Sequence, residues 1–212
     1  MRYAPLTFAL GLLVSCGSAH SQTSSDPVKN VPQGTAEQYF PQGVFGQNTH
    51  KEARYGSFLA AMREPSLFKT ARKGEITEYR LLRVLSDRAL SFRLELVVDG
   101  SGKLAVARAI CHAGKPNGVV VKDRVQVSAD HVREFLTLLQ KADFWKSETE
   151  EARDKVGFEK DGLQWVLEGV RNREYHVVDR LSTKDDDFAR VCIFLMTLTP
   201  ANLDEHAEKQ TN

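Results

Sequence analysis

The stretch Phe144–Arg180, FWKSETEEARDKVGFEKDGLQWVLEGVRNREYHVVDR, carries the strongest hairpin signal in the chain and holds both of its tryptophans. Two runs with the composition of β-strands, 162–170 and 174–181, flank the short polar sequence Arg171-Asn172-Arg173. Successive side chains of a strand point to opposite faces, so the length of this turn determines which polar residues share a face.

The segment before this hairpin has the alternation of an antiparallel meander. In 90–98 apolar residues occupy every second position, which predicts a strand with one buried face. The turn sequence 99–102, Asp-Gly-Ser-Gly, leads to a second strand, 103–111, in which alanines alternate with larger residues. A face of such small side chains would let a helix approach closely. Strands over 79–85 and 118–127 complete this part of the sheet.

Apolar residues at helical spacing predict three helices. The first covers 52–63, the second follows Ser128, a good N-cap, and the third begins in Asp185-Asp186-Asp187, where acidic residues favour a helix N-terminus. Their apolar faces are Tyr55, Phe58, Leu59 and Met62 in the first, Val132, Phe135, Leu136 and Leu139 in the second, and Phe188, Val191, Cys192, Leu195 and Met196 in the third.

These elements predict an α+β fold with a single antiparallel sheet of about six strands in the order ββββαββα. Two helices would pack on one face, and the first helix would be an N-terminal extension. We expect one such domain over 39–200. The sheet face without helices would be the natural contact surface for a partner, particularly if it exposes an apolar patch.

The first residues predict a signal peptide, 1–15. The short positive start Met1-Arg2-Tyr3 precedes an apolar run that is too short to span a bilayer permanently. Leu13-Val14-Ser15-Cys16-Gly17 resembles the lipobox of bacterial lipoproteins, in which the cysteine is diacylated and becomes the new N-terminus. Cleavage after Ala19 or Ser21, giving a secreted or periplasmic protein without lipid, is the alternative.

Lipidation of Cys16 with chains such as palmitate would make the membrane a partner of this protein in the cell envelope. Gly17 follows this cysteine in place of the aspartate associated with inner-membrane retention, so we expect the outer membrane rather than the inner one. Residues 16–38 are rich in Ser, Thr, Gln, Pro and Asn and predict a flexible tether, and 201–212 predict a disordered tail.

The charge of the chain is balanced, with 29 Lys and Arg against 28 Asp and Glu and a formal net charge of +1. This balance argues against nucleic acid as a partner, because nucleic-acid binding relies on a basic field. Hydrophobic residues make up 42% of the chain, which is enough to build a core.

The three cysteines can be interpreted in terms of the oxidising cell envelope. With Cys16 lipidated, Cys111 and Cys192 remain, and in an oxidising envelope they form either a disulfide or two separately buried thiols. A metal site that adds His112 to them is not supported, because neither C-x-x-C nor H-x-x-x-H spacing occurs. We therefore expect neither a metal nor another cofactor.

Five short motifs follow one another along the chain: Glu64-Pro65-Ser66-Leu67, Glu78-Tyr79-Arg80, Phe144-Trp145, Asp161-Gly162-x-x-Trp165-x-x-Glu168-Gly169 and Tyr175-His176-x-x-x-Arg180. Together they resemble an uncharacterised family of bacterial exported or lipid-anchored proteins over about 39–198. In that family an aromatic residue and a Ser-Pro pair follow the last arginine, where this chain has Leu181-Ser182-Thr183. The resemblance implies export and the extent of the domain, and no established activity.

A three-residue loop in the hairpin, 171–173, would create a polar site. Glu168 would then lie opposite His176, and Gln164 opposite Arg180, on one face of the sheet. A carboxylate beside a histidine can perform general acid and base catalysis. The structural alternative is a cross-strand ion pair that only stabilises the hairpin.

A two-residue loop would reverse this outcome. His176 would instead face Leu167 and join Trp165 and Val178 on an apolar side, as a core histidine. Sequence periodicity is compatible with both loops.

The leading functional hypothesis is a non-enzymatic, lipid-anchored envelope domain that binds a protein or an envelope component through Trp165, Glu168, Tyr175, His176 and Arg180. One alternative is a periplasmic inhibitor or immunity-like protein that neutralises a toxic enzyme. The other is a hydrolase that uses His176 with Glu168 and Asp161. Hydrolysis would also need a nucleophile or a metal, and the chain has no G-x-S-x-G, H-E-x-x-H or glycine-rich phosphate loop.

Overall fold

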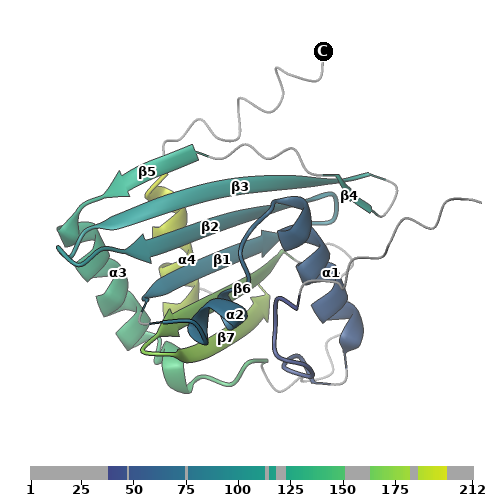
Figure 1. Cartoon of the computed structure of the whole chain (residues 1–212), viewed down its shortest axis with the longest axis horizontal. Helices are drawn as coiled ribbons and strands as arrows, with labels where there is room; N and C mark the ends of the chain where they lie inside the picture. Colours follow the sequence, from purple (N-terminus) through teal and green to yellow (C-terminus); the bar gives the residue numbers. More distant parts are fainter. Residues whose placement is uncertain are drawn as a thin grey trace, which may run out of the picture. The chain divides into compact units, whose positions relative to one another are not determined.

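One antiparallel sheet runs through the middle of the structure, which is a computed structural model (Figure 1). The structure describes residues 38–46, 48–74, 76–112, 115–117, 123–150, 163–181 and 186–199. The predicted signal peptide, the C-terminal tail and all of the tether except Gln38 lie outside these residues. The strands are β1 (Glu78–Val84), β2 (Arg88–Leu96), β3 (Gly102–His112), β4 (Lys115–Asn117), β5 (Asp123–Val127), β6 (Gln164–Arg171) and β7 (Glu174–Leu181).

The sheet is six positions wide although it has seven strands, because β4 and β5 share the outer side of β3. β4 pairs with residues 110–112 of β3, and β5 pairs with residues 102–106. The order across the sheet is β4-β3-β2-β1-β6-β7, with β5 on the same side of β3 as β4 but at its other end. The predicted α+β fold with one antiparallel sheet of about six strands is therefore confirmed. Of the strand predicted over 118–127 the structure describes β5, and β4 is an additional short strand that lies before that range.

Two helices, α3 (Ala129–Lys141) and α4 (Asp187–Thr197), cover one face of the sheet, as predicted (Figure 1). The side chain of Ser128 accepts a hydrogen bond from His131 N, and that of Asp186 from Ala189 N, so both helices have the expected caps. Their apolar faces meet the alternating residues of the strands in a core that includes Leu81, Phe92, Leu94, Leu104, Phe135, Leu139, Leu167, Val178 and Leu195.

Most of the opposite face of the sheet is also covered, so the expectation that this whole face is a free contact surface is wrong. Its exposed part is a polar corner formed by Glu95, Lys103, Arg124 and Gln126. Residues 39–45 and helix α1 (Thr49–Ala61) bury a layer of aromatic and aliphatic side chains on it: Tyr39, Phe40, Phe45, Tyr55, Phe58, Leu59 and Met62. Ala107 and Ala109 of β3 lie beneath this layer, where small side chains allow the close approach that their alternation predicted. Burial of each large side chain here contributes about 1.5–3 kcal/mol, which explains why this segment packs on the sheet.

The outer edge of β7 is covered by the chain itself. After α3 the chain forms the 3-10 turn η1 (Phe144–Lys146) and continues along β7 to residue 150. Asp179 N donates a hydrogen bond of 2.7 Å to the carbonyl of Thr149, and Arg180 donates to the carbonyls of Thr149 and Glu148 at 2.9 and 2.7 Å. An open strand edge promotes aggregation, and this segment protects β7 from it.

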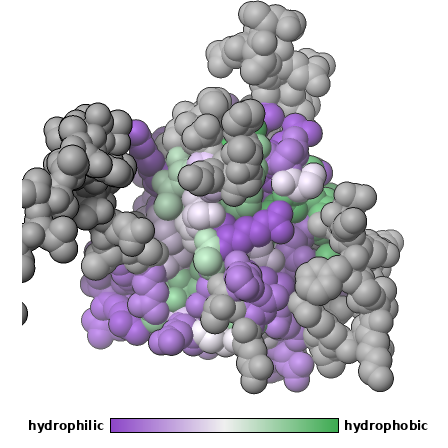
Figure 2. All heavy atoms as spheres, turned by 90° about the vertical axis from the view of Figure 1, so that its right-hand side faces the viewer, coloured by the Kyte–Doolittle hydropathy of each residue, from purple (hydrophilic) through white to green (hydrophobic). Residues whose placement is uncertain are grey.

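Hydrophilic residues predominate on the side of the molecule where α1 lies, with smaller hydrophobic areas between them (Figure 2). Four large hydrophobic residues of the described chain are exposed, and they lie on separate elements: Val98, Leu136, Leu181 and Ile193. Among the described residues, none of the helices has the length and apolar character needed to cross a membrane.

Candidate functional site

The β6–β7 hairpin closes with the two-residue loop. Asn172 and Arg173 have φ values of 48° and 66°, the positive values that a tight type I′ turn requires at both positions. Arg171 pairs with Glu174, and Gly169 therefore lies directly opposite His176. The pairing is neither of the two that the sequence left open: the loop has two residues, but Gly169 and not Leu167 lies opposite His176. This register also separates His176 from Glu168.

His176 lies on the face of the sheet that carries α3 and α4. It shares this face with Trp165, Leu167 and Val178, as predicted for the two-residue loop, although Leu167 is paired with Val178 and is not opposite His176. The polar site predicted for the three-residue loop does not form, since Glu168 projects from the other face.

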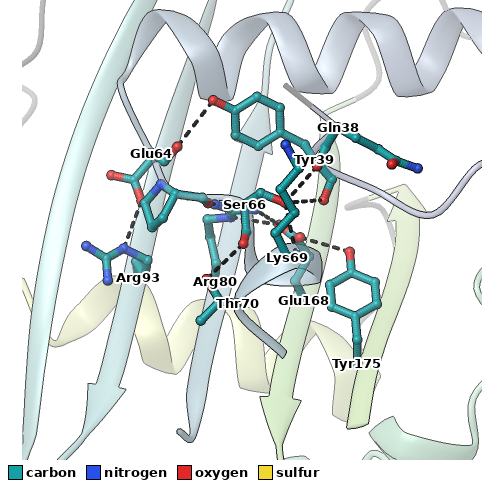
Figure 3. A network of polar contacts seen from close by, with 11 residues as sticks. Gln38, Tyr39, Glu64, Ser66, Lys69, Thr70, Arg80, Arg93, Glu168 and Tyr175 are labelled. Carbon is teal, nitrogen blue, oxygen red and sulfur yellow. Dashed lines mark hydrogen bonds and ion pairs between the residues drawn. The ribbon is translucent and has the colours of Figure 1, made fainter. Parts of the chain in front are cut away.

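Glu168 is fully buried in an ion pair with Arg80 of β1. Arg80 Nε and Nη2 lie 2.7 and 2.5 Å from Glu168 Oε2, and the hydroxyl of Tyr175 donates to Oε1 at 2.9 Å (Figure 3). The remaining Arg80 nitrogen, Nη1, donates to the carbonyl of Pro65 at 2.6 Å. Both charged side chains are completely inaccessible, so a substrate could not reach either of them.

A second arginine continues this network along β1 and β2. Arg93 Nε lies 2.9 Å from Glu64 Oε2, and Arg93 Nη1 lies 2.9 Å from Glu78 Oε1. Glu64 is almost completely buried, and it immediately precedes the Pro65 carbonyl that Arg80 binds. Two arginines from neighbouring strands thus hold the connection between α1 and α2 (Leu67–Ala71) on the sheet.

The same network fastens the residues at the end of the predicted tether. Ser66 Oγ donates to the carbonyl of Gln38 at 2.8 Å and accepts a hydrogen bond from Lys69 N, which caps α2. The hydroxyl of Tyr39 donates to the carbonyl of Glu64 at 3.2 Å. Figure 3 shows these groups converging between the start of the described chain and the sheet. We call the set Gln38, Tyr39, Glu64, Pro65, Ser66, Glu78, Arg80, Arg93, Glu168 and Tyr175 the polar anchor.

Burial dominates the electrostatics of the polar anchor. Desolvation raises the pKa of Glu168 and of Glu78, although the neighbouring arginines act in the opposite direction. It also raises the pKa of Tyr175 well above its usual value, and the charge of Glu168 adds to this effect. Glu168 has both oxygens engaged, so its chemistry is that of a structural ion pair and not of a general base.

His176 lies in an aromatic cluster beside η1. The centre of its ring is 5.1 Å from that of Phe144 and 6.1 Å from that of Trp145, and the guanidinium of Arg171 lies 4.1 Å above the Trp145 ring. Burial among these groups lowers the pKa of His176, which favours the neutral imidazole. Trp165 is buried on the same face. The charge of Glu174 acts in the opposite direction on the pKa of His176, but among the described residues no carboxylate is hydrogen-bonded to His176.

A separate charged cluster connects α1 with the β7 edge, and the sequence analysis missed it. The fully buried carboxylate of Asp179 lies 2.7 Å from Lys51 Nζ and also accepts from the amide of Gln164. Lys51 is paired with Glu150 as well. Burial raises the pKa of Asp179, although Lys51 lowers it. The sequence around Asp179 has no alternation that would mark it, because Val177 and Val178 precede it and Arg180 follows it. In β1, by contrast, Glu78 and Arg80 alternate with Tyr79 and Leu81, and this pattern marks them as polar residues of one face.

The other predicted site residues are dispersed. Arg180 binds the 148–149 carbonyls and lies 5.9 Å from the Phe188 ring centre. Cys111 and Cys192 are free thiols on opposite faces of the sheet, so the possible disulfide is absent. Asp161 and Cys16 lie outside the described residues. Within the described ranges no three His, Cys, Asp or Glu side chains are placed to hold a metal ion.

Comparison of the sequence with known proteins does not indicate a function for these residues. No protein-family model matches the chain, and no curated protein sequence matches it.

Proposed function

We propose that this chain is a non-enzymatic, lipid-anchored domain of the bacterial cell envelope that binds another protein or an envelope component. Its N-terminal signal ends in a lipobox-like sequence at Cys16. A segment of about twenty residues, rich in Ser, Thr, Gln, Pro and Asn, separates that cysteine from the folded domain. We place the protein at the outer membrane, because Gly17 follows the cysteine.

The observation that carries this proposal is the polar anchor. The first described residue, Gln38, is hydrogen-bonded to Ser66, and Tyr39 is buried and bonded to the Glu64 carbonyl. The domain is thus fastened at the point where a membrane tether would enter it. This arrangement suits a domain that must stay folded while it is attached to a membrane at one end and to a partner elsewhere.

The acid and base groups support binding over catalysis. His176 and Glu168 lie on opposite faces of the sheet, and Glu168 is inaccessible. A hydrolase based on this pair would need the carboxylate within hydrogen-bond reach of the imidazole. The polar residues that first suggested a site are therefore better explained as the supports of a rigid scaffold.

The test is crosslinking in intact envelopes, with wild-type protein and a Cys16→Ser variant. We expect acylated wild-type protein in the outer-membrane fraction and one specific crosslinked product that the variant loses or forms much less. Labelled palmitate incorporation identifies the lipid directly. A protein that incorporates no lipid and gives no specific product, while hydrolysing a substrate in a His176-dependent manner, would contradict the proposal.

A further inference from the structure

Within the described part of the chain, β5 has a neighbouring strand on one side only. It pairs with β3 on one side, and Figure 1 shows it at the margin of the sheet, next to the start of α3. Asp123, Arg124 and Gln126 of this strand are exposed. The opposite edge, β7, is covered by residues 144–150, whereas no described backbone group bonds to the outer side of β5. The β7 edge is therefore covered by another segment of the chain, whereas the outer side of β5 has no backbone partner among the described residues.

Backbone hydrogen bonds establish which residues of β3 face β5. Cys111 N donates to the carbonyl of Asp87 at 2.6 Å, on the β2 side of β3. Bonding direction alternates along an antiparallel strand. The odd-numbered residues of β3 therefore bond to β2, and its even-numbered residues bond outward to β5.

The same alternation identifies the free groups of β5. Leu104 of β3 is paired with Val125, so the odd-numbered residues of β5 bond to β3. The N–H and C=O groups of Arg124 and Gln126 consequently point away from the sheet. They are spaced as one side of a ladder that could accept an additional strand.

A groove of about 260 Å³ lies directly beside this edge. Its walls come from β5, from the first turns of α3 and from the end of α4, and they combine apolar and polar residues: Gln126, Val127, His131, Glu134, Phe194 and Leu198. Asp130 and Arg133 on the same part of α3 neutralise one another at 2.8 Å, whereas no described side chain is ion-paired with Glu134. The groove therefore combines the apolar side chains of Val127, Phe194 and Leu198 with a carboxylate, Glu134, that has no ion-pair partner among the described residues.

We propose that the β5 edge and this groove form a docking site for an extended segment of a partner protein. The segment would add as a strand to Arg124 and Gln126, insert a large apolar side chain into the groove and place a basic residue beside Glu134. In strand addition, main-chain hydrogen bonds provide affinity and a side-chain pocket provides specificity. This inference rests on the proposed binding function and names its surface and the chemistry of its partner.

The test uses purified full-length protein and a phage-displayed library of random dodecapeptides. We expect enriched peptides to share a large apolar residue next to Lys or Arg, and synthetic versions to bind in a fluorescence-polarisation assay. Gln126→Pro removes one outward N–H and keeps the β3 pairing, because proline is tolerated on an edge strand when its nitrogen faces solvent. It should weaken binding about three- to tenfold, as expected for one lost hydrogen bond.

Two matched variants complete the experiment. Gln126→Thr removes the same side chain but keeps the backbone N–H, so the difference in affinity between it and Gln126→Pro measures the lost hydrogen bond. Glu134→Gln should weaken binding of the basic peptides and reduce its dependence on salt. Circular dichroism and thermal melting confirm that each variant is folded. Failure of the library to yield a binder, or a binder indifferent to Gln126→Pro and Glu134→Gln, would overturn the docking site.

The outcome separates this inference from the proposed function. If envelope crosslinking captures a specific partner and Gln126→Pro leaves that capture unchanged, the docking site is wrong and the binding function stands. If peptides dock on β5 but the protein is neither acylated nor crosslinked in envelopes, the proposed envelope function is wrong and the docking site stands.

Discussion

The ring of Phe144 lies so close to Gly169 that a Cβ atom at this glycine would be 2.7 Å from Phe144 Cε1. The ring of Tyr79 occupies the other side at 3.1 Å. Gly169 is also the residue opposite His176, so the absence of a side chain there lets η1 and its aromatic cluster pack directly on the hairpin.

Gly169→Ala should therefore destabilise the protein. The added methyl group must displace two buried rings, and such overpacking costs about 1–3 kcal/mol. Urea unfolding monitored by tryptophan fluorescence measures this change. Gly74→Ala is the matched control, because no atom beyond its chain neighbours lies within 4 Å of the place that the new methyl group would take, and it should change the free energy of unfolding by much less. Equal stability of the two variants would contradict the packing described for Gly169.

Glu168→Gln should destabilise the protein much more than a surface substitution does. It leaves the buried charge of Arg80 uncompensated, and removing one partner of a buried pair costs about 3–5 kcal/mol. Asp130→Asn, which breaks the exposed pair with Arg133, is the control and should cost about 0–1 kcal/mol. The measurement is the same urea unfolding curve. The double variant Arg80→Met/Glu168→Leu should recover a large part of the loss, since both charges are then absent.

Stability should fall on mild acidification because of His176. Its pKa in the folded protein is lowered from the ordinary value of 6.5, chiefly by burial. Below that value the unfolded chain binds a proton that the folded protein excludes, so stability is present at higher pH and is lost as the pH falls through the folded pKa. The difference in free energy of unfolding between wild type and His176→Gln should therefore shrink from pH 7.5 to pH 5.

The matched control for this pH series is His50→Gln. His50 is an exposed residue of α1, so replacing it should change the free energy of unfolding at pH 7.5 by much less than replacing His176 does. The comparison of wild type with His176→Gln also isolates His176 from the buried carboxyl groups, whose raised pKa values change stability with pH in the opposite direction. A difference between wild type and His176→Gln that is constant with pH would show that the imidazole does not titrate differently on folding.

Ser66→Ala should loosen the attachment of the N-terminal segment. The hydroxyl caps α2 and binds the Gln38 carbonyl, so its loss should cost about 1–2 kcal/mol. Hydrogen exchange should show faster opening of residues 38–45 with little change in the β1–β6 core. Ser57→Ala, which removes a local bond within α1, is the control. Unchanged exchange at 38–45 would mean that the polar anchor does not hold this segment.

The periodicity of single segments was sufficient to predict most of the elements. Alternation in 90–98 and the caps at Ser128 and Asp186 are local properties, which is why the strands, both C-terminal helices and the α+β class could be predicted. Most residues of the polar anchor belong to the short motifs of the sequence, but the sequence did not predict that these motifs contact one another. Arg80, Glu168 and Ser66 are far apart in sequence and meet only when β1, β6 and α2 pack.

Two further features depended on tertiary structure alone. The sequence of 39–45 has no periodicity from which its packing site could be predicted. The surface on which it packs is formed by the alanine face of β3 and the arginines of β1 and β2, and it exists only in the folded protein. The turn at Asn172 and Arg173 was equally ambiguous, because a one-residue change of register exchanges the two faces of a strand. Packing selects the register: it buries Val178 and Leu167 beneath α4, pairs Glu168 with Arg80 and places His176 beside Phe144. The chain sequence determined that a hairpin forms in Phe144–Arg180, and the burial of both its faces decided which side chains each face presents.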